Sequence, residues 1–264
     1  MDPRLLVVSL LAAILALVVL YVFRRRSLSR ANSIVFVGAS DAGKTAILST
    51  LAYGQTLPSH TSLQTNTCAF SLNQKTTTLV DVPGHPRIRD QFREHLATAK
   101  AIVFVVDTSS VSRIGPIVAE HLHKILHAVV TIPPSQSPPA ILVVAHKCDL
   151  LKTGSVSATS SLEQLAINRV RTVLERELDK RRRSHTGRVA MDELGAEGED
   201  STELGGLDCT GRPGEAFKFA DWEGGNIDFI GSWVRVGEIV ELEEEKGRGG
   251  DGIERLLAWL NQLQ

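Results

Sequence analysis

The stretch from Gly38 to Thr45 constrains the fold of this chain more than any other part of it. It matches the pattern G-x-x-x-x-G-K-T, and it lies between an apolar run at 34–37 and a pattern of helical period at 46–52. A strand, a glycine-rich loop and a helix in this order bring backbone N–H groups and a helix N-terminus to one anion. The sequence therefore predicts a phosphate-binding loop made of Gly38, Ala39, Ser40, Asp41, Ala42, Gly43, Lys44 and Thr45.

Within this loop, two side chains have expected roles. Lys44 would reach the β- and γ-phosphates of a nucleotide, and the hydroxyl of Thr45 would bind Mg²⁺.

Strand and helix patterns alternate along the rest of the chain. Continuous apolar runs at 101–106 and 140–145 are typical of strands buried on both faces of a parallel sheet. Helical periodicity covers 115–130 and 161–183, and further strands are expected at 67–72, 76–80 and 227–230. This alternation predicts an α/β domain with a mostly parallel sheet, in which ligands bind beyond the carboxyl ends of the strands.

Residues 5–23 form an apolar run followed at once by Arg24, Arg25 and Arg26. Nineteen helical residues span about 28 Å, close to the hydrocarbon core of a bilayer. The run predicts a transmembrane helix, with a cleaved signal peptide and a buried core helix as alternatives. Because the arginines mark the cytoplasmic side, residues 1–4 would be a short non-cytoplasmic terminus, 24–32 a basic juxtamembrane linker and 33–264 a cytoplasmic domain.

Composition narrows the function of that domain. Beyond residue 30, acidic residues outnumber basic ones, which argues against direct nucleic-acid binding. The widely spaced Cys68, Cys148 and Cys209 form neither a disulfide framework nor a metal-binding pattern. Residues 184–215 are rich in glycine and acidic residues and predict a disordered insertion.

Two residues after the strand expected at 76–80 fit a nucleotide switch. Asp81 ends that strand, where a carboxylate can hold Mg²⁺ through water, and the backbone N–H of Gly84 can approach a γ-phosphate. His85 follows directly and is a candidate for positioning the attacking water, with a solvated loop histidine as the alternative. In the preceding loop Thr61 is the candidate that senses Mg²⁺ and γ-phosphate, and Thr65 and Thr67 compete with it.

Residues 146–149 follow the next apolar strand and match part of a guanine-reading motif, N/T-K-x-D. Asp149 would accept hydrogen bonds from the base, and Lys147 would pack on the phosphate loop. His146 stands where the motif has Asn or Thr. After the last strand, Ser232 takes the place of a small motif that closes over the base, although Trp233 departs from it.

Taken together, these features resemble one family of proteins. They are the anchor, the phosphate loop shortly after it, the sequence Asp-Val-Pro-Gly-His-Pro from Asp81, the apolar run that ends at Asp107, and the glycine-rich stretch 247–251 before the closing helix. The chain resembles the beta subunit of the signal recognition particle receptor, an Arf-related GTPase of the endoplasmic reticulum membrane.

This resemblance implies a Ras/Arf-like P-loop GTPase domain that binds GTP or GDP with Mg²⁺, held by Thr45, Thr61 and Asp81. It implies a single-pass protein of the endoplasmic reticulum that forms a heterodimer with the receptor's alpha subunit, close to ribosome and translocon. Hydrolysis would be slow or partner-dependent, because no arginine finger can be assigned. A GTP-loaded scaffold without turnover and another P-loop NTPase are the alternatives.

Overall fold

The computed structural model describes residues 4, 32–72, 75–134, 136–151, 159–192, 216–237 and 252–263. Its centre is a sheet of strand order β2-β3-β1-β4-β5-β6. The strands are β1 (Ser33–Gly38), β2 (Asn66–Leu72), β3 (Lys75–Asp81), β4 (Ala99–Asp107), β5 (Ala140–His146) and β6 (Ile227–Gly231). The helices are α2 (Lys44–Tyr53), α3 (Phe92–Leu96), α4 (Val111–Val130), α5 (Thr159–Asp192) and α6 (Glu254–Gln262), with 3₁₀ turns η1 (Arg89–Gln91), η2 (Cys148–Leu150) and η4 (Phe219–Asp221).

The sheet is parallel except at one edge, where β2 pairs antiparallel with β3. Each strand expected from the sequence is present. The prediction of an α/β fold with a mostly parallel sheet is therefore confirmed.

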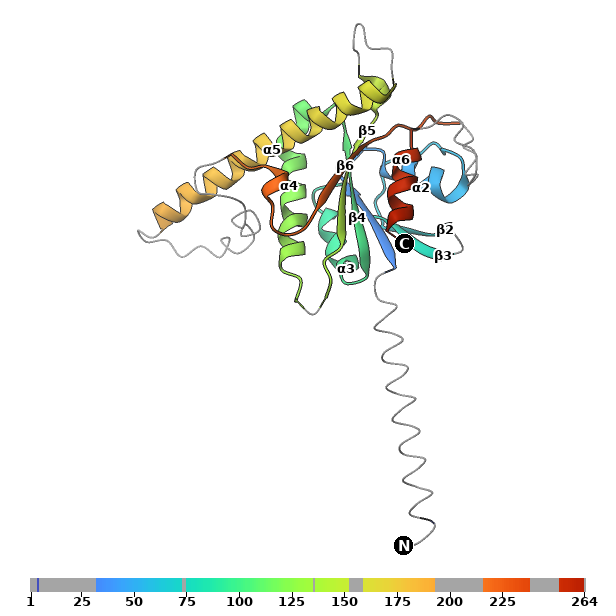
Figure 1. The fold of residues 1–264 in the computed structure, drawn as a ribbon, viewed down its shortest axis with the longest axis horizontal. Helices are drawn as coiled ribbons and strands as arrows, with labels where there is room; N and C mark the ends of the chain where they lie inside the picture. The colour runs from blue at the N-terminus through green and yellow to red at the C-terminus, as the bar shows by residue number, and fades with distance from the viewer. Residues whose placement is uncertain are drawn as a thin grey trace.

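On each face of the sheet, an apolar layer packs the strands against helices. Helices α4 and α5 cover one face, whereas α2 and α6 lie on the other (Figure 1). Side chains alternate along β1, so that Val35 and Val37 pack toward α4 and α5 while Ile34 and Phe36 pack toward α2 and α6. Because both faces are covered, every residue of β1 is buried, as its apolar run at 34–37 indicates.

Two helix boundaries differ from the prediction. Helix α4 begins at Val111 rather than at residue 115. Helix α5 continues to Asp192, so residues 184–192 are helical and the predicted disordered insertion cannot begin at 184. Extending an existing helix needs no new nucleus, so composition alone does not fix where the helix stops.

Several predictions fall on residues that the structure does not describe. The anchor 5–23, most of the linker 24–32 and residues 193–215 lie outside the described residues. No helix within the described part of the chain is long and apolar enough to cross a bilayer.

The strand register brings residues that are distant in the sequence together at the carboxyl end of the sheet. Phe36 lies opposite Asp81, Asp107 opposite His146, and Ala145 opposite Gly231. The carboxyl ends of β1, β3, β4, β5 and β6 therefore meet beside the loop that follows β1.

Candidate functional site

The loop between β1 and α2 has the backbone of an anion-binding cradle. Gly38 has a φ of 145°, and a Cβ on it would lie 2.2 Å from the carbonyl oxygen of Val105. Gly43 has a φ of 99°, and a Cβ there would lie 2.4 Å from the ring of His146. Asp41 also takes a left-handed conformation, at φ 60°. Both glycines are therefore required by conformation and by space, as expected for a loop that presents its N–H groups.

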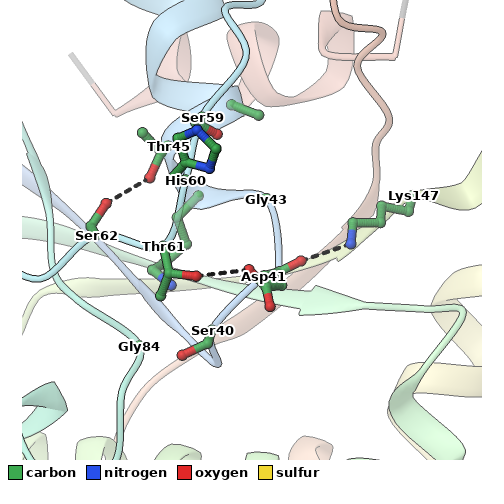
Figure 2. A pocket seen from close by; sticks show the side chains of 12 residues that line it. Ser40, Asp41, Gly43, Thr45, Ser59, His60, Thr61, Ser62, Gly84 and Lys147 are labelled. Atoms are coloured by element: carbon green, nitrogen blue, oxygen red, sulfur yellow. Dashed lines mark hydrogen bonds between the residues drawn. The ribbon is translucent and has the colours of Figure 1, made fainter.

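A cavity of about 280 Å³ lies over this loop. Part of the phosphate loop forms one wall. The other lining residues are Ala46, Ser59, His60, Thr61, Ser62, Gly84 and Lys147. Figure 2 shows Thr61 and Asp41 pointing toward one another, with Thr61 Oγ1 donating to Asp41 Oδ1 at 3.2 Å. The segment 59–62 thus closes one side of the cavity.

Lys44 lies buried beneath the cavity. Its Nζ donates to the carbonyl oxygens of Gly38 at 3.1 Å and Ala39 at 2.9 Å. Burial lowers the pKa of Lys44, while the carboxylates of Asp81 and Asp41 oppose that shift. A bound phosphate would supply the negative charge that best offsets this burial.

Thr45 and Asp81 form the oxygen-rich floor of the site. Thr45 Oγ1 donates to Asp81 Oδ2 at 2.6 Å, and Ser62 Oγ lies 3.1 Å from the same threonine oxygen. Burial raises the pKa of Asp81, and the hydrogen bond from Thr45 and the charge of Lys44 lower it in part.

This floor fits a magnesium ion. Among the described residues, Asp81 Oδ1 is buried without a hydrogen-bond partner, so it has a free acceptor. The available groups are all hard oxygens, the donor set that Mg²⁺ prefers. Thr45, Asp81 and Ser62 are therefore suited to hold Mg²⁺ or its water ligands.

On the other side of the loop, His146 and Ser232 form a buried pair. His146 Nδ1 lies 2.8 Å from Ser232 Oγ, and the ring covers Gly43. Burial, with the nearby charge of Lys147, lowers the pKa of His146 to about 3, so the ring is neutral. The carbonyl oxygen of His146 accepts bonds from the backbone and hydroxyl of Thr108. His146 and Ser232 thus support the loop from behind and do not line the cavity.

Lys147 lies across the phosphate loop. Its Nζ donates to the carbonyl oxygen of Asp41 at 2.7 Å and to Asp107 Oδ2 at 2.8 Å. Burial alone would raise the pKa of Asp107, but the bonds from Lys147 and Ser109 hold it below its usual value. The side chain of Lys147 packs on the loop, as the motif predicts.

Asp149 and His85, like His146 and Ser232, lie outside the cavity lining. Asp149 is exposed in η2, the turn that follows Lys147. His85 is also exposed, and its Nδ1 accepts a bond from the backbone N–H of Arg87 at 3.3 Å. The structure therefore brings Gly84, but not the ring of His85, to the cavity.

Sequence reasoning missed three members of the site. Ser62, not Thr61, carries the hydroxyl beside Thr45, and His60 lines the cavity. Asp107 holds Lys147. Asp107 could have been found from the sequence, because it is a carboxylate at the end of an apolar strand. The carboxyl ends of parallel strands meet at the ligand-binding end of such a sheet. No local pattern distinguishes Ser62 or His60 from the neighbouring polar residues.

The chain is similar to known proteins over most of its length. The family model described as "Signal recognition particle receptor beta subunit" matches residues 29–224. The "Signal recognition particle receptor subunit beta" of Rattus norvegicus is 33% identical over 177 residues, which cover 64% of each chain, so this match spans slightly under two thirds of the rat protein. The protein of the same name from Mus musculus is 28% identical over 272 residues, covering 99% of this chain and 88% of the mouse protein.

The fold has a counterpart among solved structures. A chain from "The Structure of the Mammalian SRP Receptor" matches with a TM-score of 0.62 and 24% sequence identity, covering 88% of this chain and all of that one. Because the sequence identity is only 24%, this match is evidence for the fold of the chain and not for its function.

Proposed function

Because the chain belongs to the family of signal recognition particle receptor beta subunits, which are Arf-like small GTPases, we propose that it is a membrane-anchored GTP-binding switch. Its output would be recruitment of the receptor's alpha subunit to the endoplasmic reticulum for co-translational protein targeting. The observation that carries this proposal is the phosphate loop, with Lys44 buried beneath it and the Thr45–Asp81 pair at its floor.

The chain's own residues account for nucleotide binding. The N-terminus of α2 and backbone N–H groups of the phosphate loop would face the phosphates, and Lys44 would offset part of their charge. Lys147 covers the loop from the base side, and the neutral His146 with Ser232 holds Gly43 in place. The exposed carboxylate of Asp149 would accept bonds from the guanine base.

Mg²⁺, when bound, would neutralise phosphate charge. Thr45 and Asp81 would hold it, with Ser62 or Thr61 completing the set. His85 lies outside the cavity lining, and none of the described residues that line the cavity is an arginine that could act as a finger. We therefore propose that hydrolysis is slow or needs a partner that turns His85 inward.

The proposed partner reads two loops. The segment 59–62 and Gly84 line the cavity in which the γ-phosphate would lie, and His85 directly follows Gly84. In GTPase switches such loops become ordered when GTP binds. An alpha subunit that contacts both loops would sense the nucleotide directly. With residues 5–23 in the membrane, this contact would hold the complex near ribosomes and the translocon.

A GTP-loaded scaffold without turnover is the second candidate. The orientation of His85, whose ring accepts a bond from its own loop, favours it. Single-turnover hydrolysis with and without the alpha subunit separates the two proposals.

The decisive experiment compares alpha-subunit binding by the full-length protein loaded with GDP or with a non-hydrolysable GTP analogue. We expect binding to the analogue form only. Lys44→Ala and Thr45→Asn should each abolish it, because they remove the phosphate cation and the Mg²⁺ hydroxyl. Equal affinity for both loaded forms would exclude a switch.

Competition with ATP and the variant Asp149→Asn control for base identity. ATP should not compete, and Asp149→Asn should shift preference from GTP to xanthosine triphosphate, because an amide replaces the accepting carboxylate. Wild-type GTP affinity in Asp149→Asn would show that Asp149 does not read the base.

A further inference from the structure

Three elements meet at the carboxylate of Glu120 in α4. Oε1 of Glu120 pairs with Arg89 Nη2 from η1. Oε2 pairs with Arg181 Nη2 from α5 at 3.3 Å, and Arg181 also donates to the carbonyl oxygen of Pro116 at 3.4 Å. We call Arg89, Glu120 and Arg181 the Glu120 cluster.

Arg89 is the buried member of this cluster. Only 4% of it is exposed, and among the described residues its Nε has no hydrogen-bond partner. The adjacent His121 is kept neutral by burial and by the charge of Arg89, so it offers Arg89 no compensation. Glu120 is therefore the group that stabilises the guanidinium inside the protein. A second pair, Lys124 with Asp90, joins the same turn to the same helix.

The backbone connects Arg89 to the nucleotide loop. The N–H groups of Ile88 and Arg89 donate to the carbonyl oxygen of His85 at 3.0 and 2.9 Å. The preceding Gly84 packs directly on the phosphate loop, since a Cβ on it would lie 2.4 Å from the backbone of Ala39 and Ser40. The segment is thus held at Gly84 by the phosphate loop and at Arg89 by Glu120.

We propose that Glu120 is a positioning residue that sets the preference for GTP over GDP. By holding Arg89, it keeps the N–H of Gly84 at the γ-phosphate side of the cavity. GDP lacks that phosphate, so its binding does not depend on Glu120. Arg181 shares the carboxylate, and through it α5 takes part in the same cluster. This inference rests on the proposed nucleotide switch.

The test measures Kd values of full-length protein for GDP and for a non-hydrolysable GTP analogue. Glu120→Gln should weaken analogue binding about tenfold and leave GDP binding within about twofold. Arg89→Gln removes the same pair without leaving a buried cation, so it should change the ratio equally even if Glu120→Gln folds poorly. The charge-swapped variant Arg89→Glu/Glu120→Arg should recover part of the preference.

Arg183→Ala is the matched control, because it removes an exposed arginine of α5 that pairs with Asp179 and not with Glu120. It should leave both Kd values unchanged. If Glu120→Gln and Arg89→Gln weaken GDP and analogue binding equally, or change neither, this inference is overturned. The proposed function is not affected by either outcome. A wild-type protein that binds neither nucleotide would overturn the proposed function and this inference with it.

Discussion

At the scale of single residues, two buried histidines make stability depend on pH. Burial lowers the pKa of both His121 and His146 to about 3, with nearby cations adding to the shift. An unfolded histidine has a pKa of about 6.5. The unfolded state therefore binds more protons between these values, so stability is complete above about pH 6.5 and declines as the pH falls toward 3.

We expect the free energy of unfolding to fall by about 1.4 kcal/mol per pH unit for each histidine well below pH 6.5. Urea denaturation at pH 7.5, 6.5, 5.5 and 4.5 measures it. His121→Leu should flatten the profile, and it should raise stability at pH 7.5 because both ring nitrogens of His121 lack partners among the described residues. Carboxylates titrate in the same pH range in both proteins. The difference in the free energy of unfolding between wild type and His121→Leu therefore reports on His121 alone. Parallel profiles would contradict a neutral, buried His121.

At the scale of elements, α5 has two parts with different roles. A helix of 34 residues is about 51 Å long. Its described core contacts, from Ala166 to Leu178, belong to the first part, which packs beside α4 against the sheet (Figure 1). We expect the second part to contribute little to the stability of the domain.

Proline substitution at exposed positions tests this division. Thr172→Pro should cost about 3 kcal/mol or more, because it breaks α5 between the buried Val170 and Val173. Ser184→Pro should cost much less, since it follows the last described core contact. Thermal unfolding of both variants measures the difference. A similar loss at both positions would mean that the far end of α5 packs against the domain.

At the scale of the whole molecule, the proposed anchor and the nucleotide site lie at opposite ends of β1. The chain enters the sheet at Ser33, and the phosphate loop begins where β1 ends, at Gly38. Removing residues 1–30 should therefore give a soluble, folded protein with unchanged GTP affinity. In sealed microsomes, external protease should digest the bulk of the full-length chain. Protection of the domain would reverse the proposed topology.

The sequence by itself determined the features that depend on neighbours along the chain. The strand–loop–helix unit from Ser33 to Tyr53, the buried strands and the alternation of strand and helix were predicted correctly, because glycine spacing and apolar period act over a few residues. That the loop binds phosphate stays a prediction. The same local argument brought Asp81, Lys147 and Ser232 to strand ends, where the structure has them. The end of α5 was wrong, since composition does not show where an existing helix stops.

Only the tertiary structure decided which side chains meet. His146 and Ser232 are 86 positions apart, Arg89 and Glu120 are 31 apart, and Glu120 and Arg181 are 61 apart. Ser62 rather than Thr61 lies beside Thr45 because of the path that the loop takes over the cavity. Such pairs follow from strand register and from the packing of helices on the sheet. Both depend on contacts throughout the domain, so no short stretch of sequence encodes them.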